Sequence, residues 1–69
     1  MTVAERIDRV NKKLSDMGSI FRADEDFVIL GYVGSLTFLR RKFNSLEELE
    51  TYVERCRVAH EKGVMIHGN

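Results

Sequence analysis

Cys56 and His60 are the first residues in this sequence whose types and spacing suggest chemistry. They lie four positions apart in an expected helix, so their side chains point the same way. His67 follows further along the chain. A structural zinc site needs four ligands, and a catalytic one needs three and a water. Because these candidates include no Cys-x-x-Cys pair, we expect neither a metal site nor a cofactor.

The same pair does not favour nucleophilic catalysis. A Cys–His pair needs an exposed thiolate, a base within hydrogen-bond reach and a third group that orients the base. Cys56 and His60 fall on the helix face that we assign to the core, which denies them that access. The sequence contains no Gly-x-Ser-x-Gly, phosphate-loop or dinucleotide-binding motif. We therefore expect a protein that is not an enzyme and has no small-molecule substrate.

The densest basic run is Arg40-Arg41-Lys42, with Phe38 and Phe43 close by. Aromatic residues beside a basic strand can bind single-stranded nucleic acid by stacking. Strand alternation places Arg40 and Arg41 on opposite faces, so they form no single groove. The whole chain has 11 basic and 11 acidic residues and no net charge, which argues against a dedicated nucleic-acid binder. A solvated strand end is the alternative interpretation of this run.

Glutamates form a stripe along the outer side of the expected C-terminal helix. On a helical wheel four of them fall within an arc of about 60°. Val58 lies beside them and points away from the core. Such a stripe suits a basic protein surface, for example the DNA-contacting face of a transcription factor, although an ordinary solvated helix face has the same pattern. The residues that we predict to bind a partner are Glu47, Glu50, Glu54, Val58, Glu61, Arg40 and Arg41.

Length and composition bound the class of protein. A chain of 69 residues, of which 43% are hydrophobic and 32% charged, is typical of one small globular domain with a marginal core. The longest apolar run, Phe27–Leu30, is far too short to span a membrane. Charged residues interrupt the N-terminus, so we expect no signal segment. A single cysteine favours the reducing cytosol, and we expect a cytoplasmic protein.

Apolar spacing and capping signals predict two helices, over residues 2–17 and 45–62. Each begins with a hydroxyl residue followed three positions later by glutamate, which is the spacing of a capping box. Each is followed by a glycine suited to the left-handed position after the last turn. These signals are Thr2, Glu5 and Gly18 for the first helix, and Ser45, Glu48 and Gly63 for the second.

Between the helices, β-branched and aromatic residues predict strands at about 20–23, 27–33 and 36–43. Gly34-Ser35 has the spacing of a two-residue hairpin turn, and Gly31 indicates a bulge or a close backbone approach. The sequence therefore predicts an α+β fold. An N-terminal helix precedes a small antiparallel hairpin or three-stranded meander, and a C-terminal helix follows, with both helices covering one side of the sheet.

The apolar residues of the first helix form a narrow seam with spacings of three and four, typical of packing against one other helix. The partner is either the second helix of the same chain or a second copy, and we expect both. The strands are apolar on both faces, so the second face needs a cover that a twofold mate supplies. We therefore predict a homodimer, with the tail, residues 63–69, either adding a strand or packing across it. The predicted dimerisation residues are Val3, Ile7, Val10, Leu14 and Met17.

The stretch 36–49, a basic strand that runs into a capped helix, resembles the small inhibitor proteins that temperate bacteriophages express early. Proteins of that group are short and free of catalytic motifs, and one of them is a small dimer that blocks a LasR-type quorum-sensing activator through its DNA-binding domain and also inhibits the type IV pilus assembly ATPase. The resemblance implies a phage anti-activator that binds a host regulatory protein in the bacterial cytosol and occludes it. No individual site residue follows from the resemblance.

We therefore predict a non-enzymatic protein–protein interaction module that blocks a transcriptional regulator and has a pilus assembly ATPase as a second target. Two alternatives stay open. One is a small nucleic-acid-binding regulator that uses the basic strand Arg40–Lys42. The other is a structural phage accessory protein.

Overall fold

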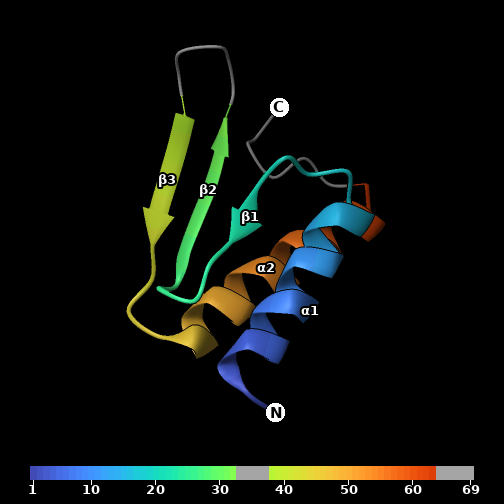
Figure 1. Ribbon diagram of the computed structural model, residues 1–69. Helices are drawn as coiled ribbons and strands as arrows, with labels where there is room; N and C mark the ends of the chain where they lie inside the picture. The colour runs from blue at the N-terminus through green and yellow to red at the C-terminus, as the bar shows by residue number, and fades with distance from the viewer. Residues whose placement is uncertain (33–37, 64–69) are drawn as a thin grey trace.

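The computed structural model describes residues 1–32 and 38–63 (Figure 1). It has an α+β fold with two helices and one three-stranded antiparallel sheet of strand order β1-β2-β3, as the sequence predicted. The predicted hairpin turn at Gly34-Ser35 and the tail after Gly63 lie outside the described residues. The elements, in chain order, are α1 Val3–Asp16, β1 Arg22–Ala23, β2 Val28–Tyr32, β3 Phe38–Lys42 and α2 Leu46–Glu61.

Both helices begin at the predicted caps. The Thr2 hydroxyl accepts the Glu5 N–H at 3.1 Å, and the Glu5 carboxylate accepts the Thr2 N–H at 3.0 Å, which completes a capping box. At the start of α2 the Ser45 hydroxyl accepts the Glu48 N–H at 3.2 Å, but the Glu48 carboxylate accepts from Asn44 instead of Ser45. The second cap therefore differs from the predicted box by one position.

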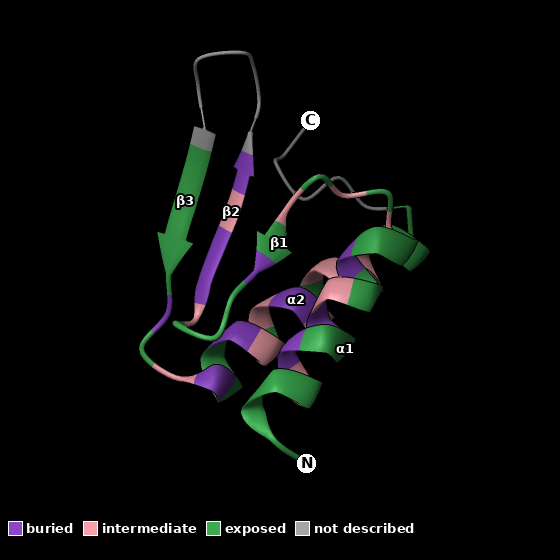
Figure 2. Cartoon of the chain, in the orientation of Figure 1, coloured by how far each residue is buried: buried purple, intermediate pink, exposed green. Residues whose placement is uncertain are grey.

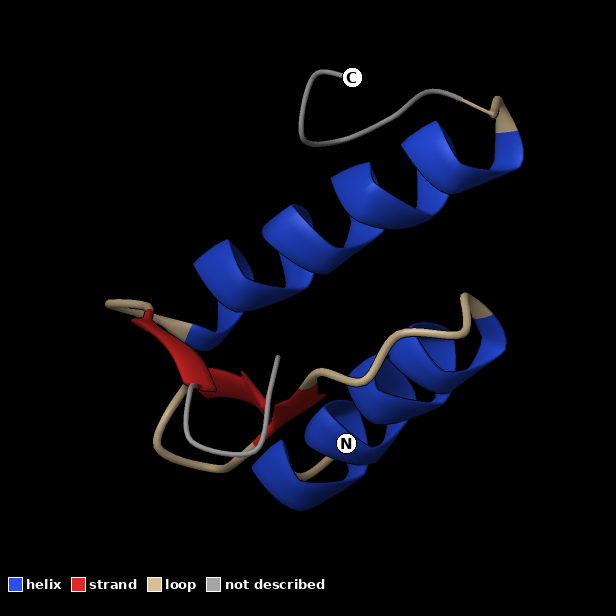
Figure 3. Ribbon diagram, turned by 90° about the horizontal axis from the view of Figure 1, so that it is seen from above, coloured by secondary structure: helices blue, strands red, loops and turns tan. Residues whose placement is uncertain are grey.

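The two helices run side by side in the same direction, on one side of the sheet, with α1 nearest β1 (Figures 1 and 3). The first turns of α1 contact the first turns of α2, and the later turns of α1 contact later turns of α2. This arrangement agrees with the chain order, in which three strands of alternating direction separate the two helices. No helix among the described residues is long and apolar enough to cross a membrane.

The core lies between the helices and the inner face of the sheet, toward the end where both helices begin (Figure 2). Leu49 and Val53 of α2 are fully buried at its centre. Inner-face residues of the sheet and the apolar face of α1 pack around them. The core residues are Ile7, Val10, Leu14, Ala23, Ile29, Phe43, Leu46, Leu49 and Val53.

Gly31 of β2 lies directly beneath the ring of Phe21. A Cβ atom at this position would stand 2.5 Å from Cδ1 and 2.8 Å from Cε1 of that ring. Real Cβ atoms do not approach other carbons so closely, so only glycine allows the ring to pack here. The sequence had indicated a bulge or a close approach at Gly31, and the close approach is the one present.

The two edges of the sheet differ. At the β1 edge, Asn11 of α1 holds the outward main chain of Ala23. Its Nδ2 donates to the Ala23 carbonyl at 3.0 Å, and its Oδ1 accepts the Ala23 N–H at 2.7 Å. This side-chain amide replaces a fourth strand on that side. At the other edge, β3 pairs only with β2 among the described residues.

Candidate interaction site

The acidic stripe of α2 meets cations of α1. The Arg6 guanidinium donates to Glu50 from Nε at 3.0 Å and from Nη2 at 2.5 Å, and its Nη2 also lies 3.3 Å from Glu47. Further along, Lys13 Nζ lies 3.2 Å from the Glu54 carboxylate. These ion pairs connect α1 and α2 through residues about forty positions apart in sequence.

Within α2, Arg57 completes the pairing of the stripe. It lies 2.6 Å from Glu54 and also pairs with Glu61. The four predicted glutamates therefore meet three cations of the same chain, which leaves one negative charge in place of four. Val58, the apolar residue predicted beside them, is half-buried. The stripe thus has little net field with which to attract a basic partner.

The ion pairs shift the protonation of their members. Hydrogen bonds from Arg6 lower the pKa of Glu50, and the same contacts raise the pKa of Arg6. Hydrogen bonds from Arg57, and then from Lys13, lower the pKa of Glu54 to about 2 from its ordinary value of 4.5. Each carboxylate therefore stays ionised in the folded chain at pH values where the unfolded chain has begun to bind protons.

This linkage predicts how stability depends on pH. The Glu54 contribution is complete above pH 4.5 and is lost as pH falls toward 2, because the unfolded chain then binds the proton first. We expect Glu54→Gln to lower the thermal midpoint by a few degrees at neutral pH and by almost nothing near pH 2. Circular dichroism melts at a series of pH values measure this. The control is Glu25→Gln, which changes an exposed turn carboxylate that has no ion pair among the described residues. It should leave the thermal midpoint unchanged both at neutral pH and near pH 2.

Three of the five predicted dimerisation residues lie inside the protomer. Ile7, Val10 and Leu14 are each no more than 5% exposed and belong to the core with α2 and the sheet. Met17 is half-buried against that core, and Val3 is 41% exposed. The apolar residues of α1 thus pack against α2 of the same chain, which is one of the two partners that the sequence predicted for them. A second copy cannot contact the three buried residues unless the core opens.

An apolar groove of about 470 Å³ opens where the core ends, between the inner face of the sheet and the later turns of both helices. Its walls are mostly apolar, and Leu39 of β3 is 54% exposed there. Beyond the core the strands and the helices run in different directions (Figure 1). The lining of the groove comprises Leu14, Met17, Ser19, Phe21, Ile29, Leu39, Arg40, Arg41, Tyr52, Cys56 and His60.

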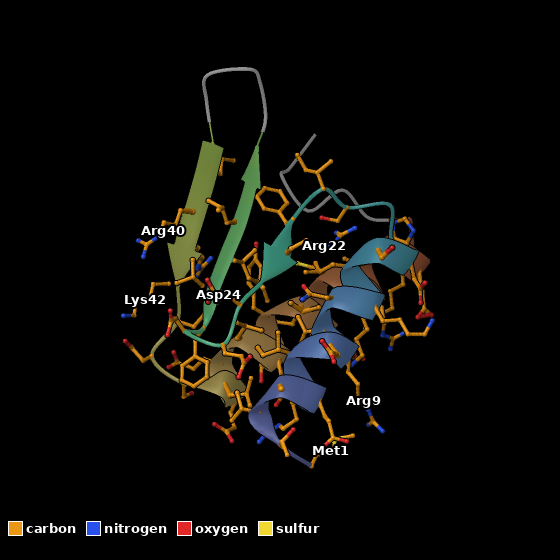
Figure 4. All side chains as sticks on the ribbon, in the orientation of Figure 1. Met1, Arg9, Arg22, Asp24, Arg40 and Lys42 are labelled. Atoms are coloured by element: carbon orange, nitrogen blue, oxygen red, sulfur yellow. The ribbon has the colours of Figure 1, made fainter. Side chains whose placement is uncertain are left out.

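The two predicted arginines of β3 have different roles. Arg41 faces the helices, and its guanidinium lies 4.8 Å from the ring centroid of Tyr52 and 5.0 Å from that of Phe43. These cation–π contacts tie β3 to α2. Arg40 points away from the molecule together with Lys42 (Figure 4). No ion pair in the described part of the chain engages either of these two side chains.

Cys56 and His60 both line the groove. Cys56 is half-buried and His60 is exposed. Both lie on the same side of α2, as predicted, but His60 is beyond the edge of the core and is not buried in it. Burial and the neighbouring Cys56 thiol raise the pKa of the Tyr52 hydroxyl. Within residues 1–32 and 38–63, no three His, Cys, Asp or Glu side chains gather as a metal site would need. His67 falls outside those residues.

No known family model, curated protein or solved structure matches this chain. The candidate site therefore rests on its own geometry. Sequence reasoning missed the groove because α1, the strands and α2 each supply only part of its wall. One signal was present, since Arg41 and Phe43 are two apart on a strand and so share a face.

Proposed function

We propose that this chain is a non-enzymatic binding module that acts by occupying a surface of a partner protein. The observation that carries the proposal is the apolar groove with Leu39 exposed at its wall. Leu39 is 54% exposed, and burial of this exposed part of the side chain in a contact is favourable. The occupant that we propose is an apolar segment of a host regulatory protein.

The identity of the partner rests on the resemblance to phage inhibitors of quorum-sensing activators and of a pilus assembly ATPase. We propose that the partner contacts the groove and not the acidic stripe. The stripe is already paired with Arg6, Lys13 and Arg57, and a partner would have to replace those contacts. The groove requires no such exchange. Inhibition would be by occlusion and needs no chemistry from Cys56 or His60.

The test compares two charge insertions at equally exposed residues. Tagged wild-type protein, Leu39→Glu and Ile20→Glu are each incubated with nuclease-treated bacterial lysate, and captured proteins are quantified by mass spectrometry. Leu39 is 54% exposed and lines the groove, whereas Ile20 is 57% exposed and is not part of its lining. We expect a regulator or ATPase that wild type and Ile20→Glu retain and that Leu39→Glu depletes about tenfold, because a carboxylate would be desolvated in the contact.

The purified regulator then provides a direct assay. Wild-type protein should compete with the regulator's DNA in a gel-shift titration, and Leu39→Glu should compete about tenfold less well. Equal capture by the two variants would show that the groove is not the contact surface. Capture that disappears on nuclease treatment would replace the proposal with nucleic-acid binding.

A further inference from the structure

The outer edge of β3 carries main-chain groups that no described residue pairs with. The Phe43 N–H donates to the Phe27 carbonyl at 2.8 Å, so the main chain of Phe43 faces β2. In an antiparallel ladder the main-chain groups alternate between the two sides of a strand. The N–H and C=O of Arg40 and Lys42 therefore face outward, and no described residue pairs with them. The β1 edge lacks this property because Asn11 occupies it.

The side chains along this edge have a definite chemical pattern. Arg40 and Lys42 project from the outer face of the sheet, in line with Arg22, since Arg22 and Arg40 both neighbour Leu30 across the strands. Leu39 projects from the inner face into the groove. A strand beside β3 would thus meet cations on its outer face and an exposed leucine on its inner face.

We infer that the β3 edge docks an extended segment of the partner protein whose side chains alternate between acidic and apolar. The segment would add a fourth strand antiparallel or parallel to β3 through the outward groups of Arg40 and Lys42. Its acidic side chains would face these two cations, and its apolar side chains would extend into the groove beside Leu39. This inference rests on the proposed function and specifies the chemistry of the partner.

A second copy of β3 is disfavoured at this edge in the registers that pair Arg40 with Arg40 or with Lys42, because like charges opposite each other destabilise a strand pair. Nucleic acid fits poorly as well. Carboxylates line the hollows beside the strand on both faces, namely those of Asp24, Glu25, Asp26, Glu47 and Glu48. Asp24, Glu25 and Asp26 share the outer hollow with Arg40 and Lys42, so a strand with single carboxylates beside these two cations meets fewer like charges than a continuous phosphate backbone does.

The test uses an end-capped peptide of about eight residues of alternating glutamate and valine as the probe. Titration into ¹⁵N-labelled protein, up to about 1 mM, is followed by NMR. We expect slowed hydrogen exchange at the amides of Arg40 and Lys42 and weaker binding when NaCl rises from about 50 to about 500 mM. A peptide in which lysine replaces glutamate should bind at least about tenfold more weakly.

Two double charge reversals provide the matched comparison. Arg40→Glu with Lys42→Glu should weaken peptide binding about tenfold or more, whereas Arg9→Glu with Lys62→Glu makes the same change in net charge away from β3 and should not. Unchanged exchange at Arg40 and Lys42, equal effects of the two double variants, or displacement of the peptide by single-stranded DNA would overturn the inference. If Leu39→Glu abolishes partner capture but the Arg40 and Lys42 reversal does not, the edge inference is wrong and the proposed function stands.

Discussion

Leu49→Ala is expected to lower the free energy of unfolding by about 2 to 5 kcal/mol. Leu49 is fully buried at the centre of the core, so truncation removes apolar contacts and leaves a cavity lined by neighbours from both helices. A domain of 69 residues is stable by roughly 3 to 10 kcal/mol. The substitution therefore removes a large part of the total, and a fraction of the variant should be unfolded at room temperature.

Urea unfolding followed by circular dichroism measures this effect. Leu49→Met preserves volume and should cost less than about 1.5 kcal/mol. Leu39→Ala removes the same atoms from a side chain that is 54% exposed and should cost less than about 0.5 kcal/mol. A free energy for Leu49→Ala within about 0.5 kcal/mol of wild type would mean that the described core is not the one that stabilises the fold.

Asn11→Ala is expected to lower the free energy of unfolding by about 1 to 3 kcal/mol and to promote self-association. The variant leaves the N–H and the C=O of Ala23 without the amide that now bonds both, and Ala23 is only 8% exposed. An unsatisfied buried polar group is destabilising. The two groups also form an unpaired strand edge, which is a template for pairing with another chain.

The same urea titration, combined with sedimentation velocity at increasing protein concentration, tests both parts of this prediction. Lys12→Ala alters the adjacent, exposed position of α1. It should change neither the free energy of unfolding nor the state of association, because the one ion pair of Lys12 among the described residues is an exposed contact with Asp16 at 3.5 Å. Wild-type stability in Asn11→Ala would show that water replaces the amide at no cost. A stable variant that stays monomeric would refute the role of Asn11 in blocking the β1 edge.

The acidic stripe illustrates the limit of a helical wheel. The wheel correctly groups the glutamates on one side of α2, because residues three and four apart are neighbours on any helix. It cannot show that Arg6 and Lys13, more than forty positions earlier, lie against that side. Pairing depends on how the two helices pack, so a surface that is strongly acidic in sequence is nearly neutral in the fold.

The groove and the two sheet edges have the same origin. Leu39, Tyr52 and Cys56 form one apolar wall only because β3 and α2 pack across the core. Nothing within the short β1 strand indicates that Asn11 occupies its edge. Nothing within β3 indicates that its outer edge has no partner among the described residues. Both properties belong to the arrangement of elements.

The features that the sequence predicted correctly depend on interactions between residues close in sequence. The caps at Thr2 and Ser45, the apolar periodicity of both helices and the β-branched strands predict the element order and the α+β fold, because each depends on neighbours within a few positions. The partners of the charged residues, the placement of His60 outside the core and the use of the α1 seam within one chain depend on contacts between distant segments. Such contacts are set by packing of the whole core, and no local pattern of residues contains them.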